Sequence, residues 1–421
     1  MGAKTVSDPI VIVGFGTAAA SAVLALRAAG YEGPLTVATD GEPQPYSPVL
    51  TSYYAGGRIR REQCNVWADL DIPNLVDDLR AHVHASALDV EAHRVSFDDG
   101  RSIRYSKLLI ATGAHPVTPG FPRTGSYSPH VLRTMADADR LKRALQAEDC
   151  KNVLVAGSSM VALKVLEACL DRGIRTTLLG RSPHILKRSA HTAIAERFEQ
   201  LLGQRGVTLR LCQTAIRCES HGADDGCTVV FDKGDAEHFD EIVLALGVEP
   251  NLCFIPDGTL ETDQGIIVDQ FMRTSAPDVF TAGDVAQALD LSTGKARIIG
   301  LWQNAVQQGR CAARAMAAEL ADHPHAQPFT GSIPSNVIHV RDILFASAGS
   351  LAEGEGRRID LHEDDGCASA LVYERRGSAE HLVGFNMLAV VTPGRTTGAH
   401  EQIGRYRAAI YRSYLEDERL L

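Results

Sequence analysis

The chain has 421 residues, too many for one hydrophobic core, and this length predicts two or three domains. Its formal net charge of −10 lacks the basic excess that general nucleic-acid binding needs, and no stretch approaches the roughly 18 uninterrupted apolar residues of a membrane-spanning helix. The N-terminal segment lacks the apolar core and cleavage site of a signal peptide, so we expect a cytoplasmic protein.

The cysteines and histidines show no metal or redox signature. Nine cysteines are scattered without a Cys-x-x-Cys motif, and we expect reduced, mostly buried thiols. His82 and His84 are predicted to share one face of a strand, and His323 and His325 flank a proline in a predicted loop. We therefore expect no metal site.

The first predicted element is a short apolar strand at 10–13, which suits a buried parallel sheet. The turn GFGTAA at 14–19 follows, then an alanine-rich helix that stops at Gly30, and then a second strand at 35–38 that leads to Asp40. This order of strand, GxGxxA turn, helix, strand and acid predicts a dinucleotide-binding βαβ unit.

Each residue type in this unit has a physical role. Gly14 allows the tight turn, Gly16 lets the backbone approach a pyrophosphate, and the small Ala19 lets helix and strand pack closely. The helix N-terminus offers unpaired N–H groups to phosphate, and Asp40 can accept hydrogen bonds from ribose hydroxyls. The expected dinucleotide contacts are Gly14, Gly16, Thr17, Ala18 and Asp40.

A second βαβ unit begins with a strand at 153–156. It continues with the turn GSSMVA at 157–162, a helix to about Leu170, a turn at Gly173 and a strand at 176–179. The chain therefore carries an internal duplication of the nucleotide-binding module.

Further strands are predicted at 105–110, running into ATGAHP at 111–116, and at 241–247. The segment 278–284 reads as a strand that ends in Gly-Asp. From about Phe329 the pattern changes to short strands with turns, which predicts an α+β terminal domain.

This set of motifs resembles the glutathione-reductase-like flavoproteins, the pyridine nucleotide-disulfide oxidoreductase superfamily, over essentially the whole chain. The resemblance implies an α/β fold with two Rossmann-like domains, the first for FAD and the second for NAD(P), plus a C-terminal α+β domain. The predicted domains are 1–115 with 250–325 for FAD, 116–249 for NAD(P), and 326–421 as a C-terminal interface domain.

The resemblance also implies further FAD contacts. Asp284 of the Gly-Asp motif corresponds to the aspartate that binds the ribityl or pyrophosphate region, and a helix start near Trp302 would stabilise negative charge on reduced flavin. The implied contacts are Ala111, Thr112, Gly113, Gly283, Asp284, Trp302 and Gln303.

Within the superfamily, PYSP at 45–48 and YYAGG at 53–57 are most similar to NADH oxidases, coenzyme A-disulfide reductases and ferredoxin reductases. Flavin subunits of acceptor-linked complexes, such as phenylglyoxylate dehydrogenases, also look similar. The disulfide reductases' cysteine pair is missing, and Val49 stands where relatives carry a single reactive cysteine, with Cys64 the nearest thiol. Reduced flavin must then pass electrons to an external acceptor or to oxygen.

The second nucleotide site departs from the usual pattern, because Ser159 replaces the glycine that lets a pyrophosphate approach. After the following strand, Arg181 stands where NADH binders usually place an acid, which favours NADPH. A solvent-facing arginine beside a turn is the alternative. The expected nucleotide contacts are Gly157, Ser158, Ser159, Met160, Arg181 and Gly247.

Ferredoxin reductases hold a lysine against the flavin, paired with a glutamate on the second-site helix. Aligned with them, this chain has Tyr53 and Lys164 at those positions, which the resemblance implies as candidate catalytic residues. Lys164 would then lack its usual partner and could approach flavin N5, or it could extend to water.

The sequence leaves two flavin enzymes and one non-enzymatic class open. The first is an NAD(P)H-dependent flavoprotein that serves a ferredoxin or an oxygenase component, with Arg58, Arg60 and Arg61 as a candidate basic docking patch or a solvated loop. The second is an oxidase, or an FAD subunit of a larger complex, with a weakened NAD(P)H site. The third is a flavin-stabilised assembly protein. A homodimer or a complex subunit is expected.

Overall fold

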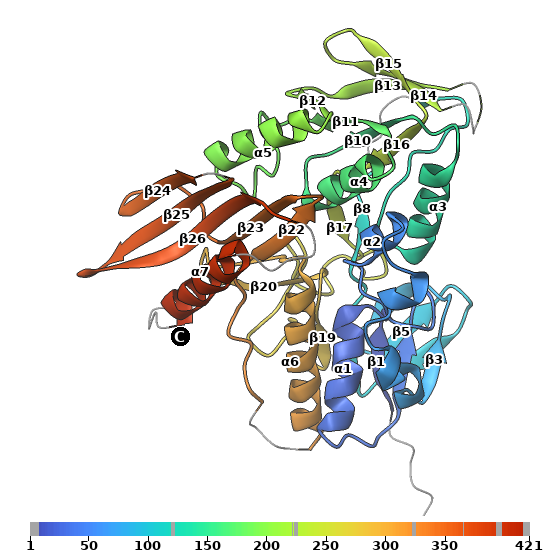
Figure 1. The fold of residues 1–421 in the computed structure, drawn as a ribbon. Coiled ribbons are helices and arrows are strands. Elements are labelled where there is room, and N and C mark those ends of the chain that lie inside the picture. Colours follow the sequence, from blue (N-terminus) through green and yellow to red (C-terminus); the bar gives the residue numbers. More distant parts are fainter. Residues whose placement is uncertain are drawn as a thin grey trace, which may run out of the picture. The chain divides into compact units, whose positions relative to one another are not determined.

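The computed structural model describes residues 8–118, 123–220, 222, 226–321, 326–364, 366–392 and 398–415. His323, His325 and the first seven residues therefore lie outside the described chain. The chain forms two compact units (Figure 1). Unit 1 comprises Met1–Ser47, Glu62–His115 and Glu249–Ser332, and unit 2 comprises Pro48–Arg61, Pro116–Val248 and Ile333–Leu421. The three-domain division remains a prediction.

Unit 1 is built on a five-stranded parallel sheet in the order β19-β7-β1-β2-β3. Its strands are β1 (Ile10–Val13), β2 (Leu35–Ala38), β3 (Asp78–Arg80), β7 (Lys107–Ile110) and β19 (Val279–Thr281). Every residue of β1, β2, β7 and β19 is buried, which explains their near-continuous apolar sequence. The predicted strands at 10–13 and 35–38 are present at the same residues.

Two helices of unit 1, α1 (Thr17–Ala28) and α6 (Trp302–Leu320), pack side by side (Figure 1). Their backbones approach so closely that a Cβ on Gly309 would lie 2.1 Å from the carbonyl oxygen of Ala18. Helix α1 stops where Gly30 adopts a left-handed conformation, φ +81°, which a glycine reaches without steric cost.

The remaining strands of unit 1 form small sheets. One is antiparallel, with β4 (Ala85–Asp89), β5 (Arg94–Phe97) and β6 (Ser102–Arg104); the other has β18 (Ile266–Ile267), β20 (Ala286–Asp290) and β21 (Lys295–Arg297). The 3₁₀ helices are Arg61–Cys64, Ala68–Leu70 and Ile72–Leu75, and β8 (Ala114–Pro116) pairs with β17 (Val248–Pro250).

The prediction of a strand face for His82 and His84 is wrong. Both lie between β3 and β4, and His82 has a left-handed backbone, φ +58°, which breaks the alternation of a strand. The Nδ1 atom of His84 lies 3.8 Å from the carboxylate of Asp40.

Unit 2 contains a second parallel sheet in the order β12-β11-β10-β16. Its strands are β10 (Asn152–Ala156), β11 (Arg175–Gly180), β12 (Thr208–Leu211) and β16 (Glu241–Leu244). Beside it run β9 (Arg123–Thr124), β13 (Ala215–Glu219), β14 (Cys227–Phe231) and β15 (Ala236–Phe239). The helices are α2 (Thr51–Ala55), α3 (Met135–Gln146), α4 (Met160–Leu170) and α5 (Thr192–Gln204).

The C-terminal part of unit 2 is an antiparallel sheet in the order β22-β23-β26-β25-β24, with helix α7 (Gly398–Leu415) packed on β26 and β23 (Figure 1). Its strands are β22 (Ser335–Val340), β23 (Ile343–Gly349), β24 (Arg357–Asp364), β25 (Cys367–Arg376) and β26 (Ala379–Val390). Two parallel Rossmann-like sheets and this α+β part confirm the predicted fold class.

The expectation of reduced thiols throughout is wrong for one pair. Cys218 on β13 and Cys227 on β14 form a disulfide, with their Cα atoms 6.1 Å apart. The antiparallel pairing of β13 with β14 places Cys218 opposite Val229, two residues from Cys227, and so brings the thiols together. The other seven cysteines are free.

The close approach of α1 and α6 predicts a stability effect. Gly309→Ala should destabilise unit 1 by about 1–3 kcal/mol, because the added methyl overlaps the Ala18 carbonyl. Both tryptophans, Trp67 and Trp302, belong to unit 1, so the tryptophan fluorescence change during urea unfolding reports on this unit. The control is Gly203→Ala on α5 of unit 2, where an added Cβ meets no atom within 4 Å. An unchanged midpoint in Gly309→Ala would show that the helices do not approach so closely.

Candidate functional site

The first glycine turn is held against the neighbouring strand. Gly14 has φ +98°, and a Cβ at this position would lie 2.3 Å from the carbonyl oxygen of Ala111 at the end of β7. Its N–H donates to the carbonyl of Ala38 at the end of β2. Only glycine fits here, so the predicted turn and the predicted segment that starts at Ala111 lie together.

The N-terminus of α1 is open above Gly16. This residue is the N-cap, with φ −82° and ψ −164°, and a Cβ built on it would meet no atom within 4 Å. No side chain caps the helix, and its first turn contains no acid. The buried hydroxyl of Thr17 has no hydrogen-bond partner among the described residues. Unpaired donors and an open backbone at a helix N-terminus fit a pyrophosphate.

The Gly-Asp turn lies against the same helix start. Gly283 has φ +89°, and its Cβ would lie 3.2 Å from the methyl group of Ala18. The Gly283 N–H donates to the side-chain oxygen of Gln308 on α6, over 2.8 Å. Gln308 is fully buried and was missed in the sequence; a polar residue on the apolar face of a predicted helix is the signal that could have identified it.

The ATG turn is fastened by Asn251. The Thr112 hydroxyl donates to the carbonyl of Asn251 over 3.0 Å, and the Asn251 amide donates to the Thr112 carbonyl over 2.8 Å. Gly113, next in the chain, has φ +67°. Asn251 was also missed, because it lies 139 residues from its partner.

The first residue of α6, Trp302, packs against a second tryptophan that precedes the 3₁₀ helix Ala68–Leu70. Trp302 stacks on Trp67 with ring centroids 6.2 Å apart, and its buried indole N–H has no acceptor among the described residues. Gln303 and Asp40 are exposed, and Asp284 is half-buried. Together with the open glycine turn, the Thr17 hydroxyl and the Trp302 indole N–H are the groups of unit 1 that would be available to hold an FAD.

The second glycine turn has the same backbone geometry as the first. Gly157 has φ +124°, and its Cβ would lie 2.2 Å from the carbonyl oxygen of Ala245. Ser159 is the N-cap of α4; its hydroxyl donates to the Ala245 carbonyl over 3.4 Å and accepts from the N–H of Ala162 over 3.5 Å. The serine hydroxyl therefore accepts a hydrogen bond from a backbone N–H of the helix. With glycine at this position, that N–H would be available to phosphate.

Arg181 follows β11 directly and is exposed. No ion pair to it is recorded within the described part of the chain. A Cβ on the preceding Gly180 would lie 3.6 Å from the Cβ of Ser158, so the end of β11 adjoins the glycine turn. Met160 is half-buried, and Gly247 has φ +112° with no atom within 4 Å of an added Cβ. The role of this exposed guanidinium in binding a 2′-phosphate stays a prediction.

Lys164 does not extend to water, which corrects that expectation, and it is paired with a carboxylate on its own helix in place of its usual partner. It is 8% exposed and forms an ion pair with Glu167, one helical turn further along α4. Its ammonium also donates to the carbonyl of His339 over 3.2 Å and lies 4.1 Å from the ring centroid of Tyr53. Glu167 was missed, although its spacing of three residues from Lys164 on a helix is a readable signal.

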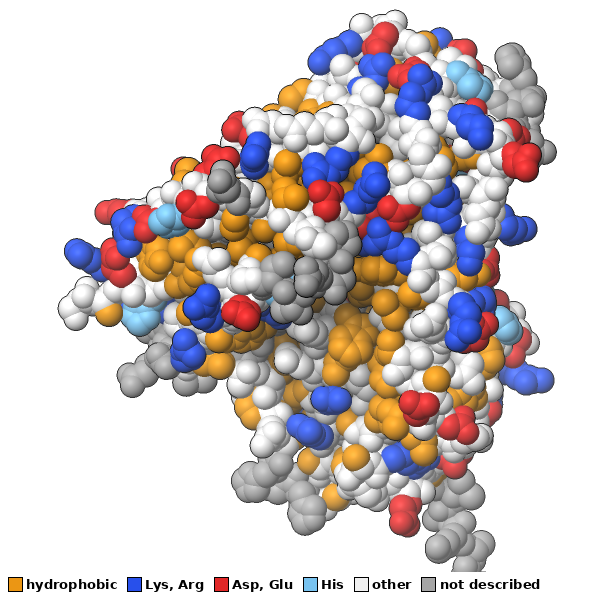
Figure 2. Space-filling view, in the orientation of Figure 1, with side chains coloured by type: hydrophobic (Ala, Val, Ile, Leu, Met, Phe, Trp, Pro, Cys, Tyr) orange, Lys and Arg blue, Asp and Glu red, His pale blue; other side chains and the backbone are white. Residues whose placement is uncertain are grey.

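The proposed arginine patch is largely engaged in ion pairs. Arg58 contacts Asp171 at 2.6 Å and Glu167 at 2.8 Å, and Arg61 lies 3.5 Å from Asp139. Figure 2 shows acidic and basic side chains interspersed over the visible face. Removing Arg58 would leave the buried Glu167 without one of its cationic partners, in addition to lowering the positive field at the surface. A substitution of Arg58 is therefore unsuited as a test of docking.

Three of the buried free thiols, those of Cys150, Cys169 and Cys311, are poor nucleophiles. Burial raises the pKa of Cys150 and of Cys169 to about 12 and that of Cys311 to about 11. Val49, at the position of the relatives' reactive cysteine, is 53% exposed. A thiol with such a raised pKa stays protonated at neutral pH and cannot relay electrons as a thiolate.

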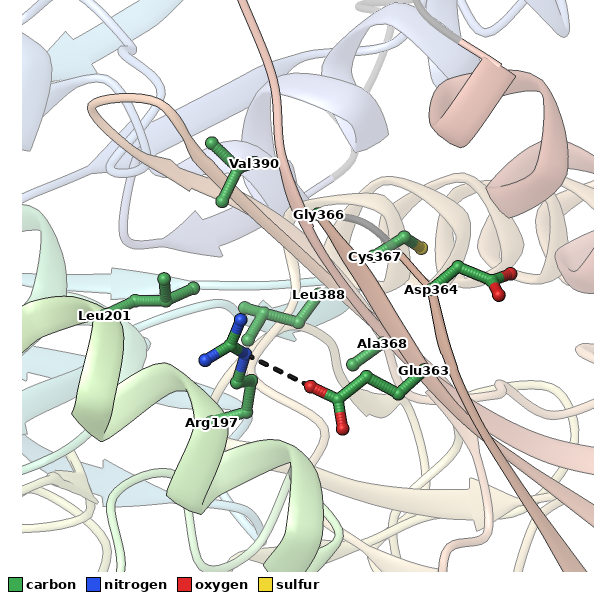
Figure 3. A pocket seen from close by; sticks show the side chains of 9 residues that line it. All are labelled: Arg197, Leu201, Glu363, Asp364, Gly366, Cys367, Ala368, Leu388 and Val390. Carbon is green, nitrogen blue, oxygen red and sulfur yellow. Dashed lines mark ion pairs between the residues drawn. The ribbon is translucent and has the colours of Figure 1, made fainter.

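A small pocket lies between α5 and the C-terminal sheet of unit 2 (Figure 3). It is lined by Arg197, Leu201, Glu363, Asp364, Gly366, Cys367, Ala368, Leu388 and Val390. Arg197 and Glu363 form an ion pair across it at 3.5 Å, and burial raises the pKa of the Cys367 thiol. It contains none of the residues predicted from the sequence.

Over the described residues, no helix is long and apolar enough to cross a membrane. In the same residues, no group of three or more His, Cys, Asp and Glu side chains is arranged to hold a metal ion.

Known proteins resemble this chain in sequence and in fold. Residues 8–309 match the family model described as pyridine nucleotide-disulphide oxidoreductase. The chain is 30% identical over 354 residues to the NADH-dependent phenylglyoxylate dehydrogenase subunit epsilon of Aromatoleum evansii, covering 84% of this chain and 82% of that protein. It is 32% identical over 312 residues to the ferredoxin–NAD(+) reductase component of the anthranilate 1,2-dioxygenase system of Burkholderia cepacia, covering 73% and 75%.

A solved ferredoxin reductase from Rhodopseudomonas palustris has the same fold, with a TM-score of 0.79 at 23% identity over 91% of each chain. The expected superfamily and the expected class of enzyme, an oxidoreductase, are confirmed by the family match. Because that match spans both glycine turns and most of the chain, the protein belongs to the pyridine nucleotide-disulphide oxidoreductase family.

Proposed function

We propose that this protein is an FAD-dependent oxidoreductase that takes hydride from NAD(P)H and passes electrons to a protein acceptor, a ferredoxin or an oxygenase component. The observation that carries the proposal is the pair of glycine turns. At Gly14 and again at Gly157, an added Cβ would overlap a carbonyl oxygen at the end of a neighbouring strand. When bound, FAD supplies the acceptor for the hydride and can release its two electrons one at a time. The chain supplies binding, orientation and the exclusion of water.

The choice of a protein acceptor rests on the missing thiol relay and on the relatives. Val49 replaces the reactive cysteine, and Cys150 and Cys169 carry raised pKa values, which supports a route for the electrons without a thiol intermediate. Relatives include ferredoxin–NAD(+) reductase components of dioxygenase systems. We extend this role to the present chain.

A second function is supported by Ser159. Its hydroxyl caps α4, which weakens the case for a bound pyrophosphate, and one relative is a subunit of a larger dehydrogenase. On this basis the protein would be an FAD subunit, or an oxidase, that receives its electrons elsewhere. We propose the cytoplasm as its location, because seven of the nine cysteines are free.

The experiment that tests the function compares acceptors. NAD(P)H oxidation is followed with oxygen alone and with [2Fe–2S] ferredoxins added. Ferredoxin should raise the rate of NAD(P)H oxidation well above the rate with oxygen alone. Equal rates with and without every ferredoxin tried would favour an oxidase or a complex subunit.

FAD binding at Gly16 is tested by a substitution that the free protein tolerates. Gly16→Val should yield colourless protein, because its side chain fills the open space assigned to the pyrophosphate. The free protein should remain folded, since an extended backbone accepts valine and no atom lies within 4 Å of the Cβ. Flavin content and the melting temperature of the flavin-free form are measured for both proteins. Stoichiometric yellow flavin in the variant would refute the assignment.

The nucleotide preference is tested at Arg181. Arg181→Ala should reduce a preference for NADPH over NADH by roughly one to two decades, because a charge-assisted pair is worth about 1.5–3 kcal/mol. The control is Arg188→Ala, which removes another exposed arginine a few residues further along. Relative kcat/KM values for the two nucleotides measure the effect. An equal change in both variants would point to general charge rather than to a specific pair.

The thiols are tested by alkylation at neutral pH. Only Cys212 and Cys253 are exposed among the free cysteines, and the raised pKa values of Cys150, Cys169 and Cys311 keep these thiols protonated and slow to react. Alkylated protein should therefore keep its rate of flavin reduction by NAD(P)H in rapid mixing. A large loss of that rate with flavin and fold retained would reveal a working thiol.

A further inference from the structure

The ring of Tyr53 has a buried cation against it. Tyr53 is half-exposed, and its hydroxyl has no hydrogen-bond partner recorded within the described chain. The Lys164 ammonium lies 4.1 Å from the ring centroid and is held by Glu167 and by the carbonyl of His339. A fixed cation on one side of a half-exposed aromatic ring makes that ring a rigid surface with a positive field.

Tyr53, on α2, packs against Lys164 of α4, in the half of that helix that begins at the second glycine turn. The segment 51–58 runs beside the helix, with Arg58 paired to Asp171 near its C-terminal end and Tyr53 at Lys164. Tyr53 is therefore at the end of this segment nearer the N-cap Ser159. Five residues at about 1.5 Å each separate Ser159 from Lys164, or roughly 7.5 Å along the helix axis. A dinucleotide with its pyrophosphate at the N-cap can reach this distance with its second base.

The charges around Lys164 sum to a net positive value. Arg58 contacts both Glu167 and Asp171, and the Arg341 side chain lies 3.8 Å from Asp171. The Arg341 backbone N–H also donates to Glu167 over 2.6 Å. The three cations Lys164, Arg58 and Arg341 thus share two carboxylates. His339 lies beside them and stacks on His400, and burial, His400 and Lys164 lower the pKa of His339.

We propose that Lys164 and Tyr53 make the nicotinamide end of the second site select the reduced nucleotide. The oxidised nicotinamide ring carries a positive charge, whereas the reduced ring is neutral. A nicotinamide ring placed against Tyr53 would be repelled by the charge of Lys164 only in its oxidised form, because the reduced ring carries no charge. Binding of NAD(P)H is then favoured and release of NAD(P)⁺ is promoted. This inference rests on the proposed function and goes beyond it, because it assigns to Lys164 a role in selecting the redox state.

The expected size follows from Coulomb's law. A unit charge about 8 Å away, in an effective dielectric of about 20 to 40, changes binding on the order of five- to thirtyfold. The nearby carboxylates reduce this field, so we expect a preference of about tenfold for the reduced form.

The test measures binding without turnover. The flavin-loaded protein is titrated by calorimetry with NAD(P)⁺, with the uncharged tetrahydronicotinamide analogue, which cannot donate hydride, and with ADP-ribose carrying the matching 2′ group. The natural protein should bind the analogue about tenfold more tightly than NAD(P)⁺. Lys164→Gln should bring this ratio close to one and leave ADP-ribose unchanged, while Arg58 still compensates Glu167. Lys164→Arg should keep the ratio.

The controls separate this inference from the proposed function. Lys187→Gln removes an exposed lysine beyond β11 and should leave the ratio unchanged. If Lys164→Gln does not fold, Tyr53→Leu provides the second variant, and it should weaken both nicotinamide forms relative to ADP-ribose. Failure of every nucleotide, including ADP-ribose, to bind the natural protein would overturn the proposed function and this inference with it. Normal ADP-ribose binding with an unchanged ratio in Lys164→Gln would overturn the inference alone.

Discussion

A backbone contact at the end of a parallel strand controls both nucleotide turns. In unit 1 a Cβ on Gly14 would lie 2.3 Å from the carbonyl of Ala111, and in unit 2 a Cβ on Gly157 would lie 2.2 Å from that of Ala245. The strands can close on the turn only when glycine occupies the position, and the helix then begins directly after the turn. The placement of α1 and α4, and so of every predicted contact on them, depends on this approach.

The two turns differ at the next key position. Gly16 leaves the start of α1 uncapped and open, whereas Ser159 caps α4 with its own hydroxyl. The same backbone therefore presents more unpaired donors in unit 1 than in unit 2. This difference agrees with a resident FAD in the first unit and with a co-substrate that binds and leaves in the second.

Local patterns predicted much of the fold. Strands at 10–13 and 35–38 and the helix that ends before Gly30 follow from apolar runs and a left-handed glycine, which are local properties. The residues around Lys164 show the same difference between local and tertiary information. Glu167 follows it by three residues and is readable on a helix, whereas Arg58 is brought to the cluster by tertiary packing over more than a hundred residues. The disulfide was missed for a similar reason, because strand register decides which thiols meet.

Anaerobic titration of the purified protein with NAD(P)H isolates the transfer of hydride to the flavin, because it requires both nucleotide sites and no acceptor. About one equivalent of nucleotide should remove the absorbance of oxidised flavin, and the Gly16 and Ser159 regions should become protected from hydrogen exchange when their ligands bind. Flavin that stays oxidised with excess NADH and NADPH, but is reduced by dithionite, would show that the second unit does not deliver hydride and would assign the electron supply to another component.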